Sequence, residues 1–172
     1  MKGEIIMPFI YEYDRSKAVD YAHKWAYGRN PAYFNFDNYG GDCTNFASQV
    51  IYAGSGVMNY TPVYGWYYID SYRRSASWTG VEYLYKFLIN NKGIGPFAER
   101  ADVYDIQVGD IIQLSFGNDG RFTHSPVVVA TGVTPSVDNI LVAAHTFDAD
   151  NRPLNTYNWT EIRYLHIIGV YK

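Results

Sequence analysis

One cysteine and four histidines are the residues of this sequence best suited to chemistry. Cys43 has no second cysteine to pair with, so its surroundings decide between a packing role and a reactive one. It follows Gly40-Gly41 and Asp42 and opens a segment with helical character. Free backbone N–H groups at a helix N-terminus favour a thiolate, and they can also hold a developing oxyanion. The pattern therefore favours a nucleophile over a packing cysteine.

A nucleophilic cysteine needs a general base within hydrogen-bond reach, and the histidines are the candidates. His124 stands at the entry to an apolar strand, where it can face a helix N-terminus packed across the strand end. His145 ends the next predicted strand, so a hairpin would bring it close to His124 and let it orient that imidazole. His23 fits a solvated position, and His166 fits a structural or surface role. We therefore expect Cys43, His124 and His145 to form the catalytic group.

Metal binding is the alternative for the same three side chains, which could hold zinc with one position open. No closely spaced ligand pair such as Cys-x-x-Cys occurs, so the sequence predicts neither a metal nor a cofactor. Asp42 is expected to cap the helix that Cys43 opens, because its charge beside a thiolate would oppose ionisation. The candidate substrate-binding residues, each with packing as the alternative, are Asp42, Asn45, Trp66, Tyr67 and Trp78.

The hydrophobic pattern places helices before strands. It predicts one helix capped by Asp14, a second from Cys43 with Gly54 as its C-cap, and a third from Thr79 to Asn90. Strands are predicted over Asp110–Phe116, His124–Thr131, Ile140–Thr146 and Glu161–Tyr171. Helices followed by an antiparallel sheet define the α+β class, and 172 residues suit a single domain over 1–172.

Composition excludes some partners. The formal net charge is −3 and no basic cluster occurs, which argues against nucleic acid. No apolar run approaches the ~20 residues of a membrane span. The first ten residues do not resemble a signal peptide, so the chain is either cytoplasmic or part of a longer exported protein at the cell wall. Aromatic residues make up 18% of the chain, with 18 tyrosines, which fits a groove for a sugar or peptide as well as core edges.

The run Gly40-Gly41-Asp42-Cys43-Thr44-Asn45-Phe46-Ala47-Ser48-Gln49 resembles the signature of the putative amidase domain family of Gram-positive bacteria. Further matches follow in order along nearly the whole chain: Arg15–Val19, Arg29-Asn30-Pro31, Ser77-Trp78-Thr79, Val108–Gln113, His124-Ser125, Ala144-His145-Thr146 and Arg152-Pro153-Leu154. That family is similar to papain-like cysteine peptidases of the NlpC and CHAP type, so the resemblance implies a papain-like fold.

The resemblance also implies a function: amide hydrolysis through a Cys43 thioester, without a cofactor, in cell-wall peptidoglycan or a related peptide. The third catalytic role falls on His145, with Asp148 or Asn151 as alternatives because the loop between the strands is long. A silent cell-wall peptide-binding module and an acyltransferase with the same Cys43 and His124 stay open. The sequence does not identify the bond that is cleaved or the oligomeric state.

Overall fold

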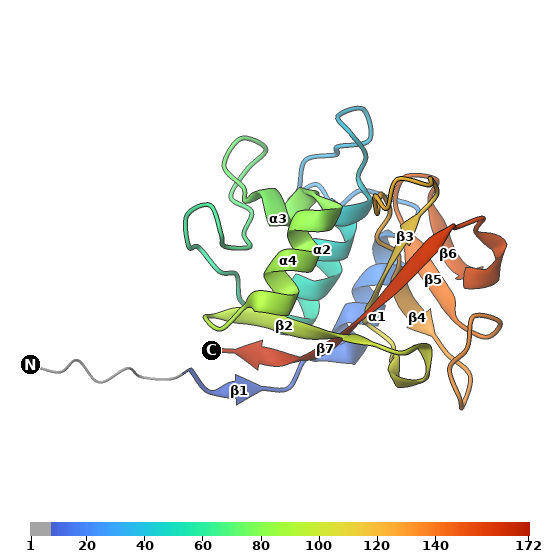
Figure 1. The fold of residues 1–172 in the computed structure, drawn as a ribbon. Helices are drawn as coiled ribbons and strands as arrows, with labels where there is room; N and C mark the ends of the chain where they lie inside the picture. The colour runs from blue at the N-terminus through green and yellow to red at the C-terminus, as the bar shows by residue number, and fades with distance from the viewer. Residues whose placement is uncertain (1–7) are drawn as a thin grey trace, which may run out of the picture.

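The structure, a computed structural model, describes residues 8–172 as a layer of helices against one face of a seven-stranded sheet (Figure 1). This arrangement confirms the predicted α+β class. The expectation for the first ten residues falls largely on residues 1–7, which lie outside the described part. Between residues 8 and 172, no helix combines the length and apolar character that a membrane crossing requires.

The helical elements lie mainly in the first half of the chain. They are α1 (Arg15–Trp25), α2 (Cys43–Ser55), α3 (Ala76–Thr79) and α4 (Val81–Asn90), with 3-10 turns η1 (Val103–Asp105) and η2 (Leu154–Thr156). The predicted cap of α1 is confirmed, because the Asp14 carboxylate accepts the Lys17 backbone N–H at 3.0 Å. α2 ends two residues later than predicted, because Gly56 rather than Gly54 takes the left-handed C-cap conformation at φ 71°. The predicted third helix is α4, which begins after Gly80, and the short helix α3 before it was not predicted.

All strand pairs are antiparallel. The strands are β1 (Ile10–Tyr11), β2 (Gly95–Ala101), β3 (Ile111–Ser115), β4 (Val127–Ala130), β5 (Leu141–Ala144), β6 (Ala149–Pro153) and β7 (Glu161–Tyr171). Their order is β1-β7-β3-β4-β5-β6, and β2 also pairs with β7. The four predicted strands are present, and β7 has the predicted bounds. The sequence did not predict β1, which is only 2 residues long, or β2 and β6, which contain proline and charged residues without an apolar period.

The central strands are buried on both faces, and alternation along them separates two hydrophobic cores. In β4, Val127 and Val129 pack with the helices, whereas Val128 packs with a smaller cluster on the opposite face. That second cluster is completed by η1 and η2, through Ile106 and Leu154. The helices pack against one face of the sheet, and the second cluster lies on the other. The face on which a side chain lies therefore decides which residues it can contact.

Candidate active site

Cys43 is the first residue of α2, and a tight turn places it there. Gly40 and Gly41 adopt φ values of 98° and 102°, which a residue with a side chain rarely adopts. The turn closes through the Gly41 N–H, which donates to the Phe36 carbonyl at 3.1 Å. The Asp42 N–H then donates to the Thr146 hydroxyl at 2.9 Å, which ties the start of α2 to the end of β5. The expected placement of Cys43 at a helix N-terminus is confirmed.

His124 lies next to this helix start. It forms a β-bridge with Leu114 ahead of β4, and its neighbours contact the first turn of α2. The Cys43 thiol donates to the Thr123 carbonyl at 3.8 Å, and the Ser125 and Thr44 hydroxyls lie 3.3 Å apart. Within residues 8–172, no hydrogen bond joins Cys43 Sγ to the imidazole of His124. Cys43 thus contacts the residue before His124, and Cys43 itself is not among the residues of the cavity wall described below.

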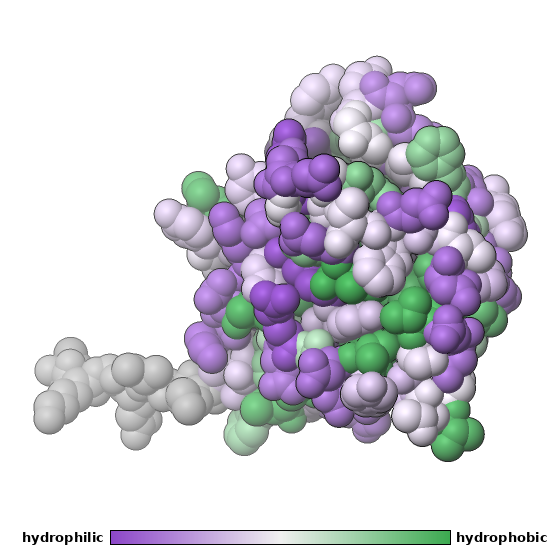
Figure 2. All heavy atoms as spheres, turned by 45° about the vertical axis from the view of Figure 1, so that its right-hand side comes forward, coloured by the Kyte–Doolittle hydropathy of each residue, from purple (hydrophilic) through white to green (hydrophobic). Residues whose placement is uncertain are grey.

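A cavity of about 560 Å³ opens beside His124. Its wall is formed by Phe116, Thr123, His124, Thr146, Phe147, Arg152, Thr156, Tyr157 and Asn158. Figure 2, which brings the β3–β6 side of the molecule forward, shows apolar side chains gathered between polar ones on that face. The cavity is large enough for a few residues of a peptide, and it presents His124 at its wall.

The turn between β5 and β6 forms part of this wall and is strained. Thr146 and Phe147 adopt φ values of 58° and 61°, a conformation that is costly for a β-branched residue such as threonine. The hydrogen bond from the Asp42 N–H to Thr146 holds the turn in place. Strained backbone of this kind clusters at functional sites. An Asn-Gly pair in a sequence predicts such a turn, whereas a Thr-Phe pair does not.

Burial keeps both proposed reactants neutral. It raises the pKa of the Cys43 thiol above its ordinary range, although hydrogen bonds from Thr44 and from the Ser125 backbone N–H act in the opposite direction. Burial also lowers the pKa of His124 to about 4, with a smaller contribution from the nearby positive charge of Arg152. Near neutral pH, the pair is therefore a thiol beside a neutral imidazole. The direction of the Cys43 pKa is therefore opposite to the one expected from a helix N-terminus alone.

Alkylation by iodoacetamide tests this resting state directly, because any adduct on the single cysteine is at Cys43. We expect the labelling rate to titrate above the ~8.5 of an ordinary thiol. Thr44→Val should move the titration further upward, because it removes the hydroxyl that lowers the pKa of Cys43. Mass spectrometry of quenched samples across pH 6–11 measures both rates. A titration clearly below ~8.5 in the wild type would contradict this account.

His145 is placed differently from the prediction. Its Nδ1 lies 2.5 Å from Asp42 Oδ2, and its Nε2 lies 2.8 Å from the Trp25 carbonyl oxygen. Its ring also stacks on Phe46, with centroids 4.1 Å apart. Both ring nitrogens are thus occupied away from His124, so the expected orienting contact between the two histidines is wrong.

Sheet register gives the physical reason. Val127 of β4 pairs with Ala143 of β5, and both face the helices. His145 lies two residues beyond Ala143 and shares its face, whereas His124 is bridged to Leu114, which packs in the second cluster on the opposite face. The two histidines are close along the hairpin, as predicted, yet their side chains leave the sheet in opposite directions.

The Asp42 side chain makes hydrogen bonds to buried groups instead of a helix-capping bond. It occupies the N-cap position of α2, but its side chain makes no capping hydrogen bond. One carboxylate oxygen accepts the Phe36 N–H at 2.8 Å and the Asn45 side chain at 2.9 Å, and the other faces His145. The carboxylate is fully buried. Asp42 thus occupies the predicted N-cap position without the side-chain capping bond, and its burial leaves its carboxylate no exposed surface.

The two alternatives for the third catalytic residue are also located elsewhere. Asp148 forms a two-pronged ion pair with Arg29, with both N–O distances at 2.9 Å. Asn151 is exposed in β6 with a φ of 52°, and neither residue belongs to the cavity wall. Asn158, by contrast, lines the cavity with His124. No sequence pattern pointed to Asn158, because it lies in an irregular segment after η2.

Two of the expected groove aromatics belong to the core. Trp66 and Trp78 are fully buried, and their indole N–H groups donate to Ser48 and Asn45 at 3.0 Å each. Asn45 is buried between Trp78, Asp42 and the Phe34 carbonyl. Tyr67 is half-buried and packs against Tyr60, outside the cavity wall. The substrate-binding prediction is therefore wrong for Trp66, Trp78 and Asn45, and the structure does not connect Tyr67 with the cavity.

A second hollow of about 580 Å³ lies near η1 and contains His166. Asp110 accepts a hydrogen bond from the His166 ring at 2.7 Å and forms an ion pair with Arg15 at 2.7 Å. No cysteine, serine or second histidine of the described residues lines it. Within residues 8–172, no group of three His, Cys, Asp or Glu side chains is arranged to hold a metal ion. The cavity beside His124 is therefore the candidate active site.

Comparisons with known proteins identify the family of the chain. The chain is 40% identical over 147 residues to a protein named "Uncharacterized protein YhbB" from Bacillus subtilis (strain 168), an alignment that covers 83% of this chain and 44% of that protein. The chain thus spans less than half the length of this relative. No solved structure matches the chain. The model of the family described as "Putative amidase domain" matches residues 12–168, which include Cys43, His124 and the whole cavity wall. The chain therefore belongs to the putative amidase domain family.

Proposed function

We propose that the protein is a cysteine-dependent amide hydrolase in which Cys43 is the nucleophile and His124 the general base. The observation that carries this proposal is the placement of Cys43 at the start of α2 against residues 123–125, beside a cavity whose wall contains His124. A helix start supplies N–H groups for an oxyanion, and the cavity supplies room for the substrate. Membership of the amidase family supports amide hydrolysis in general.

The reaction begins from the neutral pair. His124, kept neutral by its lowered pKa, takes the proton of the Cys43 thiol as the sulfur attacks the amide carbonyl. The backbone N–H of Cys43 and a neighbouring donor stabilise the tetrahedral oxyanion. The protonated His124 then gives its proton to the departing amine, which leaves a thioester on Cys43. Water, activated by His124, hydrolyses the thioester and restores the thiol.

A papain-like arrangement is the fold that this proposal implies. A nucleophilic cysteine at a helix start and a histidine at a strand entry are the features by which the sequence resembles the NlpC and CHAP peptidases. The antiparallel sheet and the helix layer support that likeness. By the same resemblance, we propose peptidoglycan or a related peptide as the substrate. The half-exposed and exposed aromatic residues Phe116, Phe147 and Tyr157 at the cavity are compatible with a peptide chain.

Digestion of purified Gram-positive peptidoglycan tests the proposal. The wild type and Cys43→Ala are incubated with the polymer, and released fragments are identified by mass spectrometry. We expect new fragments from the wild type alone, since alanine has no nucleophile to form the thioester. Circular dichroism shows that the variant is folded, and the fragment masses identify the bond that is cleaved.

The same experiment separates the alternatives. If neither protein releases fragments but both sediment with the wall, the site is a binding module. If an added amine is incorporated into the fragments in place of water, the enzyme is an acyltransferase. Equal release by the wild type and Cys43→Ala would exclude Cys43 as the nucleophile.

A further inference from the structure

When His124 is neutral, Arg152 is the one charged residue in the wall of the cavity beside His124, among the residues that the structure describes. It lies in β6, one residue after Asn151, and its side chain is half-buried. The remainder of the wall consists of aromatic rings, hydroxyls and one amide. A substrate that enters this cavity therefore meets the positive charge of Arg152 close to His124.

The guanidinium of Arg152 is held in position by its own neighbours. Its Nε–H donates to the Thr156 hydroxyl at 2.9 Å, and its Nη2 donates to the Thr156 carbonyl at 3.1 Å. The Thr156 hydroxyl donates in turn to the Pro153 carbonyl at 2.7 Å. The guanidinium carbon also stacks over the Tyr157 ring, 3.7 Å from its centroid. These contacts fix one edge of the planar group and leave Nη1 without a hydrogen-bond partner in residues 8–172.

Three other arginines that are partly shielded from solvent are neutralised by carboxylates, whereas Arg74 donates to Thr79 and stacks over Phe36 outside the cavity wall. Arg15 pairs with Asp110, Arg29 with Asp148 and Arg163 with Glu82, at 2.7, 2.9 and 2.7 Å. Arg152 has no carboxylate within ion-pair distance in the part of the chain that the structure describes. A planar guanidinium with one edge fixed and the other available suits a carboxylate, which it can bind with two hydrogen bonds.

The Tyr157 hydroxyl is a second polar group at this wall without a partner. Its oxygen is buried, and no hydrogen bond to it is formed within residues 8–172. Buried hydroxyls are nearly always hydrogen-bonded, so an unpaired one at a cavity points to a ligand that completes it. The Tyr157 ring lies under the Arg152 guanidinium and 5.6 Å from the His124 ring, between their centroids. Arginine and tyrosine thus supply adjacent donors on the same side of the cavity.

We propose that Arg152, supported by Tyr157, binds a carboxylate of the substrate, so that this site accepts amides whose cleaved portion carries a free carboxylate close to the scissile bond. The inference rests on the proposed function, because it names the substrate class for the same site. Such a carboxylate is supplied either by a C-terminal residue or by an acidic side chain. In both cases it forms charge-assisted hydrogen bonds with the guanidinium and places the scissile carbonyl between Cys43 and His124.

Protection of Cys43 from iodoacetamide tests the inference without hydrolysis. The first probe pair is N-acetyl-Ala-Ala with a free C-terminal carboxylate and the same peptide as its C-terminal amide. The second is N-acetyl-Ala-Glu amide and N-acetyl-Ala-Gln amide, which examines a side-chain carboxylate. Mass spectrometry follows alkylation as each peptide is titrated, and half-protection gives its apparent affinity. Iodoacetamide is neutral, so the label itself does not interact with the charge of Arg152.

We expect at least one acid to protect about tenfold better than its neutral partner, as charge-assisted hydrogen bonds would give. Arg152→Gln should abolish this preference, and Arg152→Lys should retain part of it, because lysine keeps the charge but not the planar fork. Tyr157→Phe should reduce the preference less than Arg152→Gln does. The pair that shows the preference identifies which carboxylate is bound.

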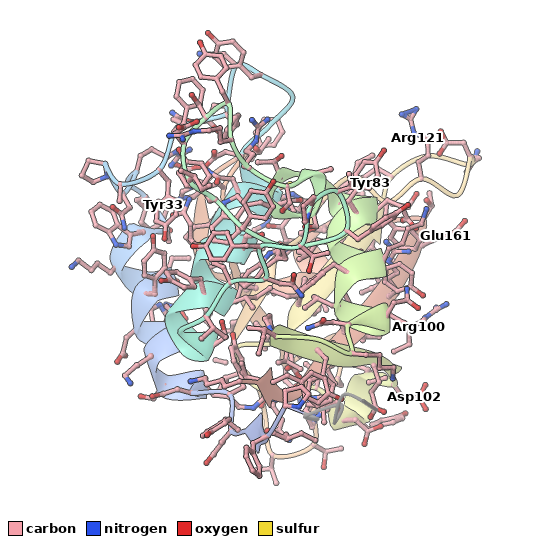
Figure 3. The ribbon with its side chains drawn as sticks, turned by 90° about the vertical axis from the view of Figure 1, so that its left-hand side faces the viewer. Tyr33, Tyr83, Arg100, Asp102, Arg121 and Glu161 are labelled. Atoms are coloured by element: carbon pink, nitrogen blue, oxygen red, sulfur yellow. The ribbon has the colours of Figure 1, made fainter. Side chains whose placement is uncertain are left out.

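Arg100→Gln is the matched control, because it removes the same charge from an exposed position on β2, outside the cavity wall (Figure 3). It should leave the preference unchanged. Equal protection by acid and amide in both pairs, or a preference that survives Arg152→Gln, would overturn the inference. This failure is distinguishable from failure of the proposed function, since a protein that digests peptidoglycan without preferring acids fails only here.

Discussion

His124→Gln is expected to lower kcat for amide hydrolysis by about 10²- to 10⁴-fold, which is the usual contribution of a general base. Glutamine is polar and similar in reach, yet it cannot take the thiol proton. The raised pKa of Cys43 makes this loss severe, because the thiol does not ionise by itself near neutral pH. Steady-state kinetics on a peptide released by the wild type measures the change.

Stability should hardly change in this variant. Neither ring nitrogen of His124 has a hydrogen-bond partner among residues 8–172, and the side chain borders a cavity. Urea denaturation should therefore give a free energy of unfolding within about 1 kcal/mol of the wild type. A large loss of stability, or retained turnover, would remove His124 from the proposed mechanism.

The pH profile gives a second readout of the same residue. The imidazole is a base only when neutral, and its pKa of about 4 keeps it neutral at higher pH. The acidic limb of kcat/KM should therefore fall with a midpoint near 4, where His124 becomes protonated. A midpoint near 6.5 would show that burial does not shift this histidine in solution.

His145→Gln should have the opposite signature, with a free energy of unfolding lowered by about 3–5 kcal/mol. His145 is fully enclosed, and its two ring nitrogens face a carboxylate oxygen and a carbonyl oxygen. Both of these partners are hydrogen-bond acceptors that the imidazole satisfies in the core. Removal of the imidazole leaves the buried Asp42 carboxylate without its closest partner, because Arg29 Nε lies 3.6 Å away.

Asp42→Asn and the double variant complete a mutant cycle for this pair. Simultaneous replacement removes both members of the buried pair, so the double variant should lose less stability than the sum of the single variants. Urea denaturation of the four proteins gives the coupling energy. Unchanged stability in His145→Gln, with turnover reduced as strongly as in His124→Gln, would return His145 to the catalytic group.

The sequence predicted the helices and strands whose apolar residues recur at helical or strand spacing. Helical spacing located α1 and α4, and apolar runs located β3, β4, β5 and β7. The Gly-Gly-Asp-Cys run predicted the helix start at Cys43, because glycine and helix termini have local signatures. These signals depend on a few neighbouring residues, so one sequence is sufficient to recognise them.

The remainder of the site depends on contacts that no local pattern records. The face of His145 is fixed by the register between β4 and β5, and a shift by one residue would reverse it. Trp66 lies in a glycine- and tyrosine-rich loop and Trp78 in the short helix α3 that follows it, yet both indoles donate hydrogen bonds to residues of α2. Arg152 and Tyr157 line the same cavity as the Thr146-Phe147 turn, and no sequence pattern predicts the positive φ values of that turn.

The most direct test of the central claim is detection of a thioester on Cys43 during turnover. The protein is mixed with a peptide that it cleaves, quenched in acid within milliseconds to seconds, and analysed by intact-protein and fragment mass spectrometry. We predict a transient adduct with the mass of the acyl portion, located on Cys43 and absent from Cys43→Ala. Turnover by the wild type with no adduct at any time, together with undiminished turnover by Cys43→Ala, would contradict the account.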